Sequence, residues 1–564
     1  MEGFTKEGIY FVALGGAEEV GFNMFAYIVD GRIIVVDAGY GFLRDDFPGM
    51  EMGLADASFL ETYRDNIEAM FITHGHEDHY GAIGHVLPLL QCPVYANDFT
   101  LGHIRARLHE YHWENFADLR SATDNPVVKL KNFEVEFVSL VHSVPQSAGL
   151  FIRTRYGNIL HATDWRFDDG KTMMLPTDYP VLQKIAAEGV ALYVGDSTNM
   201  SETLPEPSEY EIRESLMQLL PTLQNTVVAT CFASNIMRLE SLVLAAAAAG
   251  RTAVVVGHSL NQNLKIAREC GYLQNCPPIH DIKDAGDIPS DKVLYICAGS
   301  QGNYRSTLSR IANGESKDII LGKGDNIIFS SKIIPGNEEK IERMQEKLRD
   351  AGVTVISAED YLVHASGHAT PEQILSMYRL LKPQTVIPVH GDKRNIRRQK
   401  KLALENGVGN VLTVRDGEVA LLKDGRGEIV ADVFTRKLGV DRKQLTPLDS
   451  QLVKSRKRIA YNCSVFISVF FAADWHLVDL QISSIDILEE AAFAELRDKI
   501  IADIFKDIDK EIIKLNYNAN QIKEYLAARI RRQIFKATDI KPVVFMHFYK
   551  EPETGASSVL NTGR

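Results

Sequence analysis

The sequence predicts an α/β protein of three units, in which a strand-rich domain is interrupted by an inserted α/β domain and followed by a small C-terminal one. Three observations predict this fold class. Short β-branched runs ending in Asp or His fill the first 200 or so residues, helices and strands alternate from about Ser208, and the strand-to-His pattern returns near His390. A chain of 564 residues is also too long for a single hydrophobic core.

The first unit is predicted to cover residues 1–207. Its runs include "RIIVVDAGYG", "AMFITHGH" and "GNILHATD", each apolar and each closing on a polar or charged side chain. This pattern is typical of sheet strands that deliver polar groups to one edge, where α/β and sandwich folds build their sites.

The second unit is predicted over 208–360, where helical patterns alternate with the strands "TVVATCF", "TAVVVGHS" and "DNIIFSSKIIPG". Such alternation favours a largely parallel sheet. The segment "TVIPVHGD" then resumes the earlier style, so residues 361–440 are expected to close the first domain. A charged linker over 441–458 leads to a last unit, 459–564, with two strands, two helices and a final strand.

Composition limits the function classes. Hydrophobic and charged contents of 45% and 24% are ordinary for a soluble globular enzyme, and without a secretory signal or a membrane-length apolar run we expect a cytoplasmic protein with no membrane partner. Six scattered cysteines without a CxxC pair indicate reduced thiols, so His and carboxylates must hold any metal.

A net charge of -12 gives no overall attraction to nucleic acid. Local basic clusters therefore carry more weight than the total. They are "KRNIRRQKK", "KSRKR" and "RIRRQIFK", for each of which a solvated helix face is an equally good interpretation.

The stretch "FITHGHEDHYGA" carries the strongest chemical signal, an HxHxDH cluster at His74, His76, Asp78 and His79. With 16 histidines in the chain, chance would produce this spacing about once in a thousand such chains. Four potential ligands on so short a loop imply two metal ions, and imidazole with carboxylate suits Zn or Mn. Further candidates at strand ends are His142, Asp164 and His390.

Other histidines near the cluster are expected to have structural roles. His85, His103, His109 and His112 lie in helix-like runs, where packing or surface positions are usual, and His161 is expected to be a core histidine. The glycines of "ALGGAEEVG" are predicted to form a tight hairpin near the metal site, because no GK[ST] ending follows them.

The motifs resemble known families. Asp37 in "VVDAG", the HxHxDH cluster, His142 and Asp164 follow the order of the metallo-β-lactamase superfamily. "GDSTN", "HASGHA" and "VHGD" look like motifs A, B and C of its β-CASP branch. With "TCFASNIMR", "AGSQGNY" and "IIPGNE", the chain is most similar to the ribonuclease J family along essentially its full length.

This resemblance implies a metallo-β-lactamase αββα sandwich with an inserted β-CASP domain and a small C-terminal dimerisation domain. It also implies a set of metal roles. His74, His76 and His142 would hold one divalent ion, Asp78, His79 and His390 the other, with Asp164 bridging and Asp37 orienting the ligands.

The implied chemistry is hydrolysis of RNA. Two ions would activate water for in-line attack on phosphorus, and His368, oriented by Asp196, would protonate the leaving 3′-oxygen, so that products carry 5′-phosphates. The resemblance implies a 5′-to-3′ exonuclease with endonuclease capability in RNA maturation, rRNA processing and decay. It also implies a homodimer or homotetramer.

A phosphate pocket for the monophosphorylated RNA 5′ end is implied beside the metals. Its candidate residues are Ser234, Asn235, Ser300, Gln301, His364 and Ser366. Three positions depart from the family pattern, namely the "GNYRS" segment, His258 and Gln146, so the 5′-end preference stays open.

Functions of other classes also stay open. A small-molecule metallo-hydrolase would not need the long insert or the motif B and C histidines. A non-catalytic RNA-binding or assembly paralogue would be expected to have lost ligands, and none is missing here. Within nucleases, a dedicated endonuclease or a DNA-directed relative is the alternative.

Overall fold

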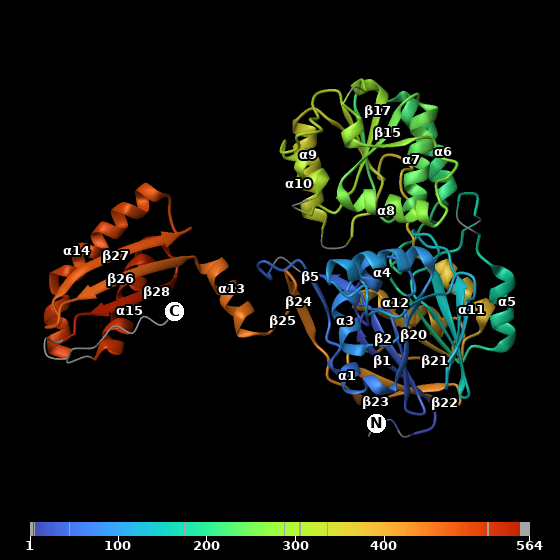
Figure 1. The fold of residues 1–564 in the computed structure, drawn as a ribbon, viewed down its shortest axis with the longest axis horizontal. Coiled ribbons are helices and arrows are strands. Elements are labelled where there is room, and N and C mark those ends of the chain that lie inside the picture. Colours follow the sequence, from blue (N-terminus) through green and yellow to red (C-terminus); the bar gives the residue numbers. More distant parts are fainter. Residues whose placement is uncertain are drawn as a thin grey trace. The chain divides into compact units, whose positions relative to one another are not determined.

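The computed structural model describes residue 4 and residues 6–43, 46–168, 170–173, 176–286, 288–303, 306–334, 337–515 and 518–552. They form two compact units, 1–42 with 52–438 and 43–51 with 439–564, which are considered separately (Figure 1). Tyr304 and Arg305 of "GNYRS", and Pro335 and Gly336 of "IIPGNE", lie outside the described residues. None of the described helices is long and apolar enough to cross a membrane.

The first unit contains two sheets packed face to face. Phe25 and Tyr27 of sheet 1 share one buried core with Leu150 and Ile152 of sheet 2. In spatial order, sheet 1 consists of β23 (Arg426–Asp432), β22 (Glu418–Lys423), β1 (Ile9–Gly15), β2 (Met24–Val29), β3 (Arg32–Val36), β6 (Ile67–Phe71), β7 (Val94–Ala96) and β8 (Leu119–Ser121). Sheet 2 consists of β21 (Asn410–Val411), β20 (Thr385–Val389), β13 (Leu192–Asp196), β12 (Gly157–Ala162), β11 (Ala148–Thr154), β10 (Glu134–Ser139) and β9 (Val127–Lys129).

Helices cover the outer faces of this sandwich (Figure 1). Leu182 and Met377 pack against the outer face of sheet 2, where Leu160 is buried. The helices over sheet 2 are α5 (Tyr179–Glu188), α11 (Pro371–Leu381) and α12 (Lys393–Glu405). Those beside sheet 1 are α1 (Ser58–Thr62), α2 (Glu77–Tyr80), α3 (Ile83–Leu90) and α4 (Asp98–Glu110), with the β4 (Tyr40–Phe42) and β5 (Met52–Ala55) pair nearby in the chain.

The insert forms a three-layer domain around sheet 3, whose described strand pairs are all parallel. Sheet 3 has the order β16 (Ile279–Asp281), β15 (Thr252–Val256), β17 (Val293–Cys297), β14 (Val227–Thr230), β18 (Asn326–Phe329) and β19 (Thr354–Ile356). One face packs against α6 (Glu209–Leu219), α7 (Ile236–Ala248) and α8 (His258–Glu269), and the other against α9 (Thr307–Ala312) and α10 (Glu338–Asp350). The insert also contains the short 3-10 helices η2 (Leu220–Thr222), η3 (Ile282–Asp284) and η4 (Ser290–Lys292), whereas η1 (Arg64–Asn66) precedes β6 in the sandwich. These layers confirm the predicted fold class.

The second unit holds a three-stranded sheet, sheet 4, in the order β27 (Leu477–Ile485), β26 (Ser464–Phe471) and β28 (Val543–Lys550). Its buried face packs on α14 (Glu490–Leu515) and α15 (Ala519–Thr538) through residues such as Ile467, Ile504 and Ile530. Before it come β24 (Lys437–Asp441), whose first two residues belong to the first unit, β25 (Gln444–Pro447) and α13 (Gln451–Asn462). The segment predicted as a charged linker thus contains a helix, which begins where the Ser450 side chain accepts a hydrogen bond from Val453 N.

Candidate active site

Strand ends bring the predicted site residues to one edge. In sheet 1, β3 and β6 are parallel, so Asp37 and His74 emerge at the same end. In sheet 2, β12, β13 and β20 are parallel, and they deliver Asp164, Asp196 and His390. The structure brings all seven predicted ligands together, in two groups that share Asp164.

The first group comprises His74, His76, His142 and Asp164. His142 Nδ1 donates to the Gly367 carbonyl at 2.7 Å, and His74 Nδ1 lies 3.0 Å from the Thr73 hydroxyl. The Thr73 hydroxyl donates to Asp37 and therefore accepts from His74 Nδ1. With both Nδ1 atoms protonated, the Nε2 atoms of His74 and His142 present lone pairs. Both Nε2 atoms face His76 Nδ1, at 3.1 Å and 3.0 Å respectively.

Three imidazole nitrogens within 4.8 Å of one another fit a metal ion. His76 Nδ1 can donate at most one proton, so at least one of the two Nε2 lone pairs has no donor unless a cation lies among the three nitrogens. The buried Asp164 carboxylate adds a negative charge 3.6 to 3.7 Å from the Nε2 atoms of His142 and His74. Burial lowers the pKa values of His74 and His142, which keeps both rings neutral as ligation requires.

The second group comprises Asp78, His79, Asp164 and His390. His390 Nε2 lies 3.1 Å from Asp78 Oδ2, and His79 Nε2 lies 3.3 Å from Asp164 Oδ2. Burial by itself would lower the pKa of His79, but the carboxylates of Asp164, Asp78 and Asp37 raise it to about 10. The carboxylates therefore favour a positive charge at the centre of the second group, and a divalent cation would supply it.

Asp37 holds the loop that carries the cluster. Its Oδ2 accepts from His79 Nδ1 at 2.7 Å, and its Oδ1 accepts from the Thr73 backbone N–H at 2.8 Å. Asp37 and His390 both adopt left-handed backbone conformations, with φ of 63° and 52°. Such strain, of order 1–3 kcal/mol for a non-glycine residue, is typical of functional sites.

Two glycines allow the close packing of this site. A Cβ on Gly39 would lie 1.6 Å from the carbonyl oxygen of Asp78, and one on Gly367 would lie 2.6 Å from the His142 ring. The glycines of "VVDAG" and "ASGHA" are therefore needed for close approach of the chain to the cluster.

His368 and the buried Asp196 form a hydrogen-bonded pair beside the second group. His368 Nδ1 donates to Asp196 Oδ2 at 2.7 Å, and both residues belong to a third convergent group with Asp164 and His390. Burial opposes charge on His368, but Asp196 and Asp164 raise its pKa above the usual value. His368 lowers the pKa of Asp196 to about 2 against the effect of burial. This imidazole, with a side chain 20% exposed, can hold and release a proton next to the cluster.

Most of the predicted phosphate-pocket residues make hydrogen bonds within the protein. Asn235 accepts from Arg238 N and caps α7, while the Gln301 amide bonds Lys332 O and Ile334 N. Three more, Ser234, Ser300 and Ser366, lie in loops after β14, after β17 and before His368, and Ser366 Oγ accepts from Asn199.

His364 differs from these residues. Its Nδ1 lies 3.4 Å from Arg238 Nη1, and its buried Nε2 has no hydrogen-bond partner among the described residues.

Two of the residues that differ from the family pattern, Gln146 and His258, lie at the beginnings of helices. Gln146 Oε1 accepts from Phe99 N at 2.8 Å, which satisfies the first turn of α4. His258 is the first residue of α8 and is exposed.

Several residues at the site were not among those predicted. Asn23 Nδ2 donates to Asp78 O at 3.0 Å and lies 3.1 Å from His79 Nε2, and the Thr198 hydroxyl lies 3.0 Å from His390 Nδ1. Asn199 donates to His368 O at 2.9 Å. Thr198 and Asn199 belong to the quoted "GDSTN" motif, so their polar side chains beside Asp196 were the available signal.

The predicted hairpin of "ALGGAEEVG" is present and contacts the site. β1 and β2 pair antiparallel on either side of it, and Gly16 O accepts from His390 N at 2.8 Å. His161 is a core histidine as predicted, fully buried with Nδ1 2.7 Å from the Tyr27 hydroxyl.

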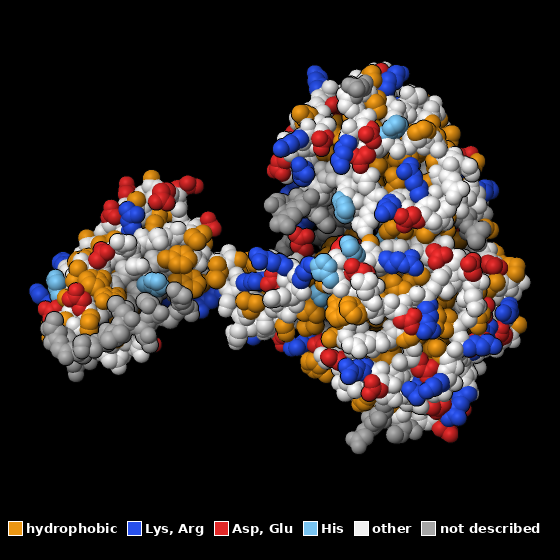
Figure 2. Space-filling view, viewed as in Figure 1, with side chains coloured by type: hydrophobic (Ala, Val, Ile, Leu, Met, Phe, Trp, Pro, Cys, Tyr) orange, Lys and Arg blue, Asp and Glu red, His pale blue; other side chains and the backbone are white. Residues whose placement is uncertain are grey.

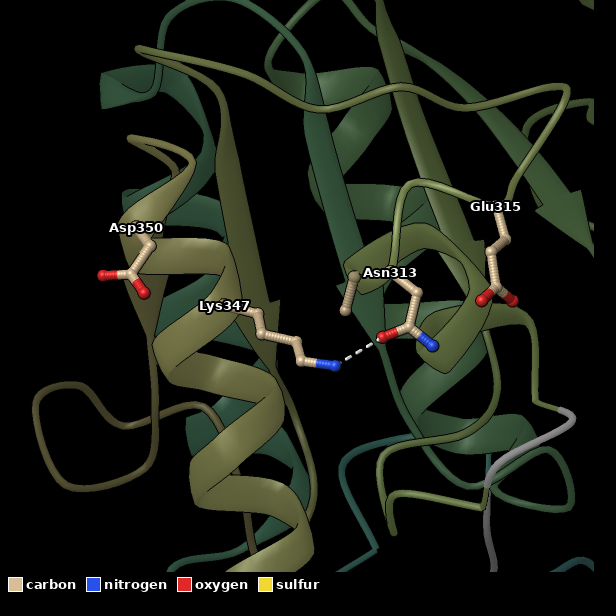
Figure 3. A pocket seen from close by; sticks show the side chains of 5 residues that line it. Asn313, Glu315, Lys347 and Asp350 are labelled. Atoms are coloured by element: carbon tan, nitrogen blue, oxygen red, sulfur yellow. Dashed lines mark hydrogen bonds between the residues drawn. The ribbon is translucent and has the colours of Figure 1, made fainter. Parts of the chain in front are cut away.

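A separate hollow of about 530 Å³ lies in the inserted domain between α9 and α10 (Figure 3). Lys347 and Asn313 point toward each other across it and are bonded at 2.8 Å, while the Asp350 carboxylate points away. None of its lining residues is a predicted site residue, so it has no part in the site described above.

Comparison with known proteins decides the family. Three family models match, described as the metallo-beta-lactamase superfamily (21–210), the ribonuclease J beta-CASP domain (224–348) and a Zn-dependent metallo-hydrolase RNA specificity domain (352–414). Ribonuclease J of Sinorhizobium meliloti is 33% identical over 513 residues, which cover 88% of this chain and 90% of that protein. The chain belongs to the ribonuclease J family.

Two further relatives extend the comparison. Ribonuclease J of Mycolicibacterium smegmatis is 36% identical over 77% of this chain and 78% of its own. That of Helicobacter pylori is 29% identical over 96% of this chain and 80% of its own. A crystal structure of a protein of unknown function from Enterococcus faecalis V583 shares the fold, with a TM-score of 0.51, 17% identity, and coverage of 74% of this chain and all of that one.

Membership of the ribonuclease J family makes this chain a hydrolytic ribonuclease that binds RNA as substrate. The metallo-hydrolase fold and the His and Asp groups together indicate divalent metal binding. The predicted family, fold class and enzyme class are therefore confirmed.

Proposed function

We propose that this enzyme hydrolyses RNA phosphodiesters to products with 5′-phosphates, acting as a 5′-to-3′ exonuclease with endonuclease capability in RNA maturation and decay. The observation that carries the proposal is the His368–Asp196 pair, because both residues belong to the same convergent group as Asp164 and His390, where His368 would act as the proton donor. A metal site alone would suit many hydrolases. A partly buried acid beside the metal site suits the release of an alkoxide leaving group.

Two divalent ions, Zn or Mn, are proposed to bind in the first and second groups. His74, His76 and His142 would hold one, Asp78, His79 and His390 the other, and Asp164 both. When bound, such ions activate water and neutralise charge that develops on a transferring phosphoryl group.

The chain's own residues perform the remaining steps. Asp37 and the Gly367 carbonyl fix the ring orientations of His79 and His142, since each accepts from the Nδ1 atom. Asp196 keeps the Nδ1 proton of His368 in place, so His368 Nε2 would donate a proton to the departing ribose 3′-oxygen.

We also propose that the 5′-monophosphate binds beside motif B. The buried, unpartnered Nε2 of His364 supports this, as does the placement of Ser234 and Ser300 after the adjacent parallel strands β14 and β17. Side chains of Asn235, Gln301 and Ser366 would serve mainly by fixing these loops, because each is engaged within the protein.

One experiment tests the reaction. Purified enzyme with Mn²⁺ is incubated with internally labelled RNA that bears a 5′-monophosphate or a 5′-triphosphate. We expect mononucleotides with 5′-phosphates, released faster from the monophosphorylated RNA. Substitution of Ser300 by Ala should raise KM for that substrate with little change in kcat. Products with 3′-phosphates, or no cleavage by metal-loaded protein, would contradict the proposal.

We propose further that the second unit assembles the enzyme into a homodimer or homotetramer. Apolar side chains lie on both faces of sheet 4, and the open face carries two in-register stacked pairs. Phe466 and Phe545 stack at 5.3 Å between ring centroids, and Phe470 and Tyr549 at 5.0 Å. Hydrophobic side chains also gather on the face of this unit seen in Figure 2. Exposed apolar patches of this kind typically bind partners, so a second copy would cover this face.

Surface variants test the assembly better than truncation, because residues 43–51 cluster with 439–564. Phe466→Glu combined with Phe545→Glu should yield monomers in analytical ultracentrifugation. The matched control is Phe505→Glu, which alters a 43%-exposed aromatic residue of α14 outside sheet 4. A double variant that sediments as the wild type does would exclude this face as the interface.

A further inference from the structure

We propose that the exposed face of α12 binds the sugar-phosphate backbone of the RNA strand next to the active site. This inference rests on the proposed function and adds a location for the substrate beyond the reacting phosphodiester. The helix carries six Lys or Arg residues and one acidic residue among its 13 positions. In a chain with a net charge of -12, this concentration of positive charge stands out locally.

The basic residues of α12 lie on one face. Lys393, Arg394, Arg397, Arg398 and Lys401 are all exposed, and their spacing places them side by side on a helix. The opposite face is buried through Asn395, Ile396, Gln399 and Ala403. At 1.5 Å per residue, the basic face extends about 12 Å along the helix axis, enough to meet more than one phosphate of a strand.

The helix is fixed rigidly to the active site. It begins at Lys393, three residues after His390, with Asp392 as its N-cap. Asn395 Nδ2 donates to Thr198 O at 2.8 Å, and Ser197 Oγ donates to Gln399 Oε1 at 2.5 Å. Both partners belong to the loop that follows Asp196. A strand held by α12 would therefore be held in a fixed position relative to His368 and the metal groups.

Much of the charge on this face is not neutralised by the protein. Lys393 lies 3.4 Å from Glu18, and Lys401 lies 3.7 Å from Glu405. Within the described part of the chain, no carboxylate comes within 4.0 Å of Arg394 or Arg397. The substrate of this family, RNA, carries the complementary charge, because every linkage of RNA has one phosphate anion.

A charge-removal experiment tests the assignment. Arg394→Gln with Arg397→Gln removes two exposed charges from α12. The control, Lys423→Gln with Arg426→Gln, removes two exposed charges from the β22–β23 hairpin. That hairpin lies at the far end of sheet 1, because Leu422 pairs with Ile9 while Gly16, after the other end of β1, contacts His390. The seven residues of β1 separate the two ends by about 20 Å.

Binding is measured by fluorescence anisotropy in EDTA, with an RNA of about 20 nucleotides and a series of salt concentrations. Each lost phosphate contact should reduce the slope of log K against log salt by about 0.7, so the α12 variant should lose about 1.4. At 0.1 M salt this corresponds to binding roughly 25-fold weaker than wild type. Hydrolysis of a dinucleotide, which has one phosphodiester and no flanking phosphate for the helix to bind, should be unchanged. The control pair should leave affinity and slope unaltered.

The outcomes separate the inference from the function on which it rests. If the wild type binds and cleaves RNA but the α12 variant has the same affinity and slope, the inference is overturned while the proposed function stands. If dinucleotide hydrolysis falls as much as binding of long RNA, α12 acts by positioning His390, and the inference is again overturned. If the wild type itself neither binds nor cleaves RNA, both are overturned. Unchanged thermal unfolding confirms that the variant is folded.

Discussion

Asp164→Asn is the sharpest test of the proposed metal centre. One Asp164 oxygen lies 3.3 to 3.7 Å from the Nε2 atoms of His74, His79 and His142, and the other lies 3.5 Å from His390 Nδ1. No other residue belongs to all three convergent groups of the described chain. The substitution removes one negative charge from each proposed site while it retains the size of the side chain.

The magnitude follows from the two shared sites. Bound metal ions supply several kcal/mol of transition-state stabilisation, and each 1.36 kcal/mol is a factor of ten in rate. A loss of about 4 kcal/mol would lower kcat roughly 10³-fold. Metal content, measured by mass spectrometry on protein dialysed against Zn²⁺ or Mn²⁺, should fall from two ions per chain to one or none.

The control addresses damage to the sandwich core. Tyr27→Phe removes the buried 2.7 Å hydrogen bond to His161 and should cost about 1 kcal/mol of unfolding free energy. Its metal content should equal that of the wild type. If Asp164→Asn retains two ions and wild-type turnover, the shared-carboxylate interpretation of the site is wrong.

Three further substitutions test the proton donor, the support of a metal ligand, and a buried ion pair of the inserted domain. His368→Ala should lower kcat by roughly two to four orders of magnitude with metal content unchanged, because it removes a general acid rather than a ligand. Asp37→Asn should weaken metal binding roughly 10- to 100-fold in chelator competition, because His79 Nδ1 loses its 2.7 Å acceptor. Arg238→Met should lower the unfolding free energy by about 3 to 5 kcal/mol in urea titration, because it leaves the buried Glu209 carboxylate unpaired; Glu209→Gln in the same chain should restore part of that loss.

The convergence of the candidate ligands could be predicted from the sequence because their spacing is local and chemically specific. HxHxDH places four side chains at the end of a single strand, and strand-terminal His142, Asp164 and His390 could be assigned through the order of family motifs. Parallel pairing then brings them to one edge. Whether they bind two ions remains a prediction.

Other parts of the site depend on contacts that sequence patterns do not encode. The amide of Asn23 reaches Asp78 and His79 only because the β1–β2 loop folds over the cluster. Asn235 and Gln301 resemble ligand-binding residues in their motifs, yet tertiary packing gives their side chains internal partners. Likewise, nothing in "LRDDFPGME" (Leu43–Glu51) indicates that it groups with residues 439–564.

The insertion within the sandwich has a consequence for the order of assembly. Leu192 of β13 pairs with Thr385 of β20, although a whole domain lies between them in the chain. At synthesis rates of about 5 to 20 residues per second, β13 waits about 10 to 40 seconds on the ribosome for its neighbour. Throughout that interval one edge of sheet 2 has unpaired backbone groups, and such an edge favours aggregation. Prompt folding of the inserted domain would limit the exposure that remains after β20 is made, because it shortens the distance over which β20 must find β13.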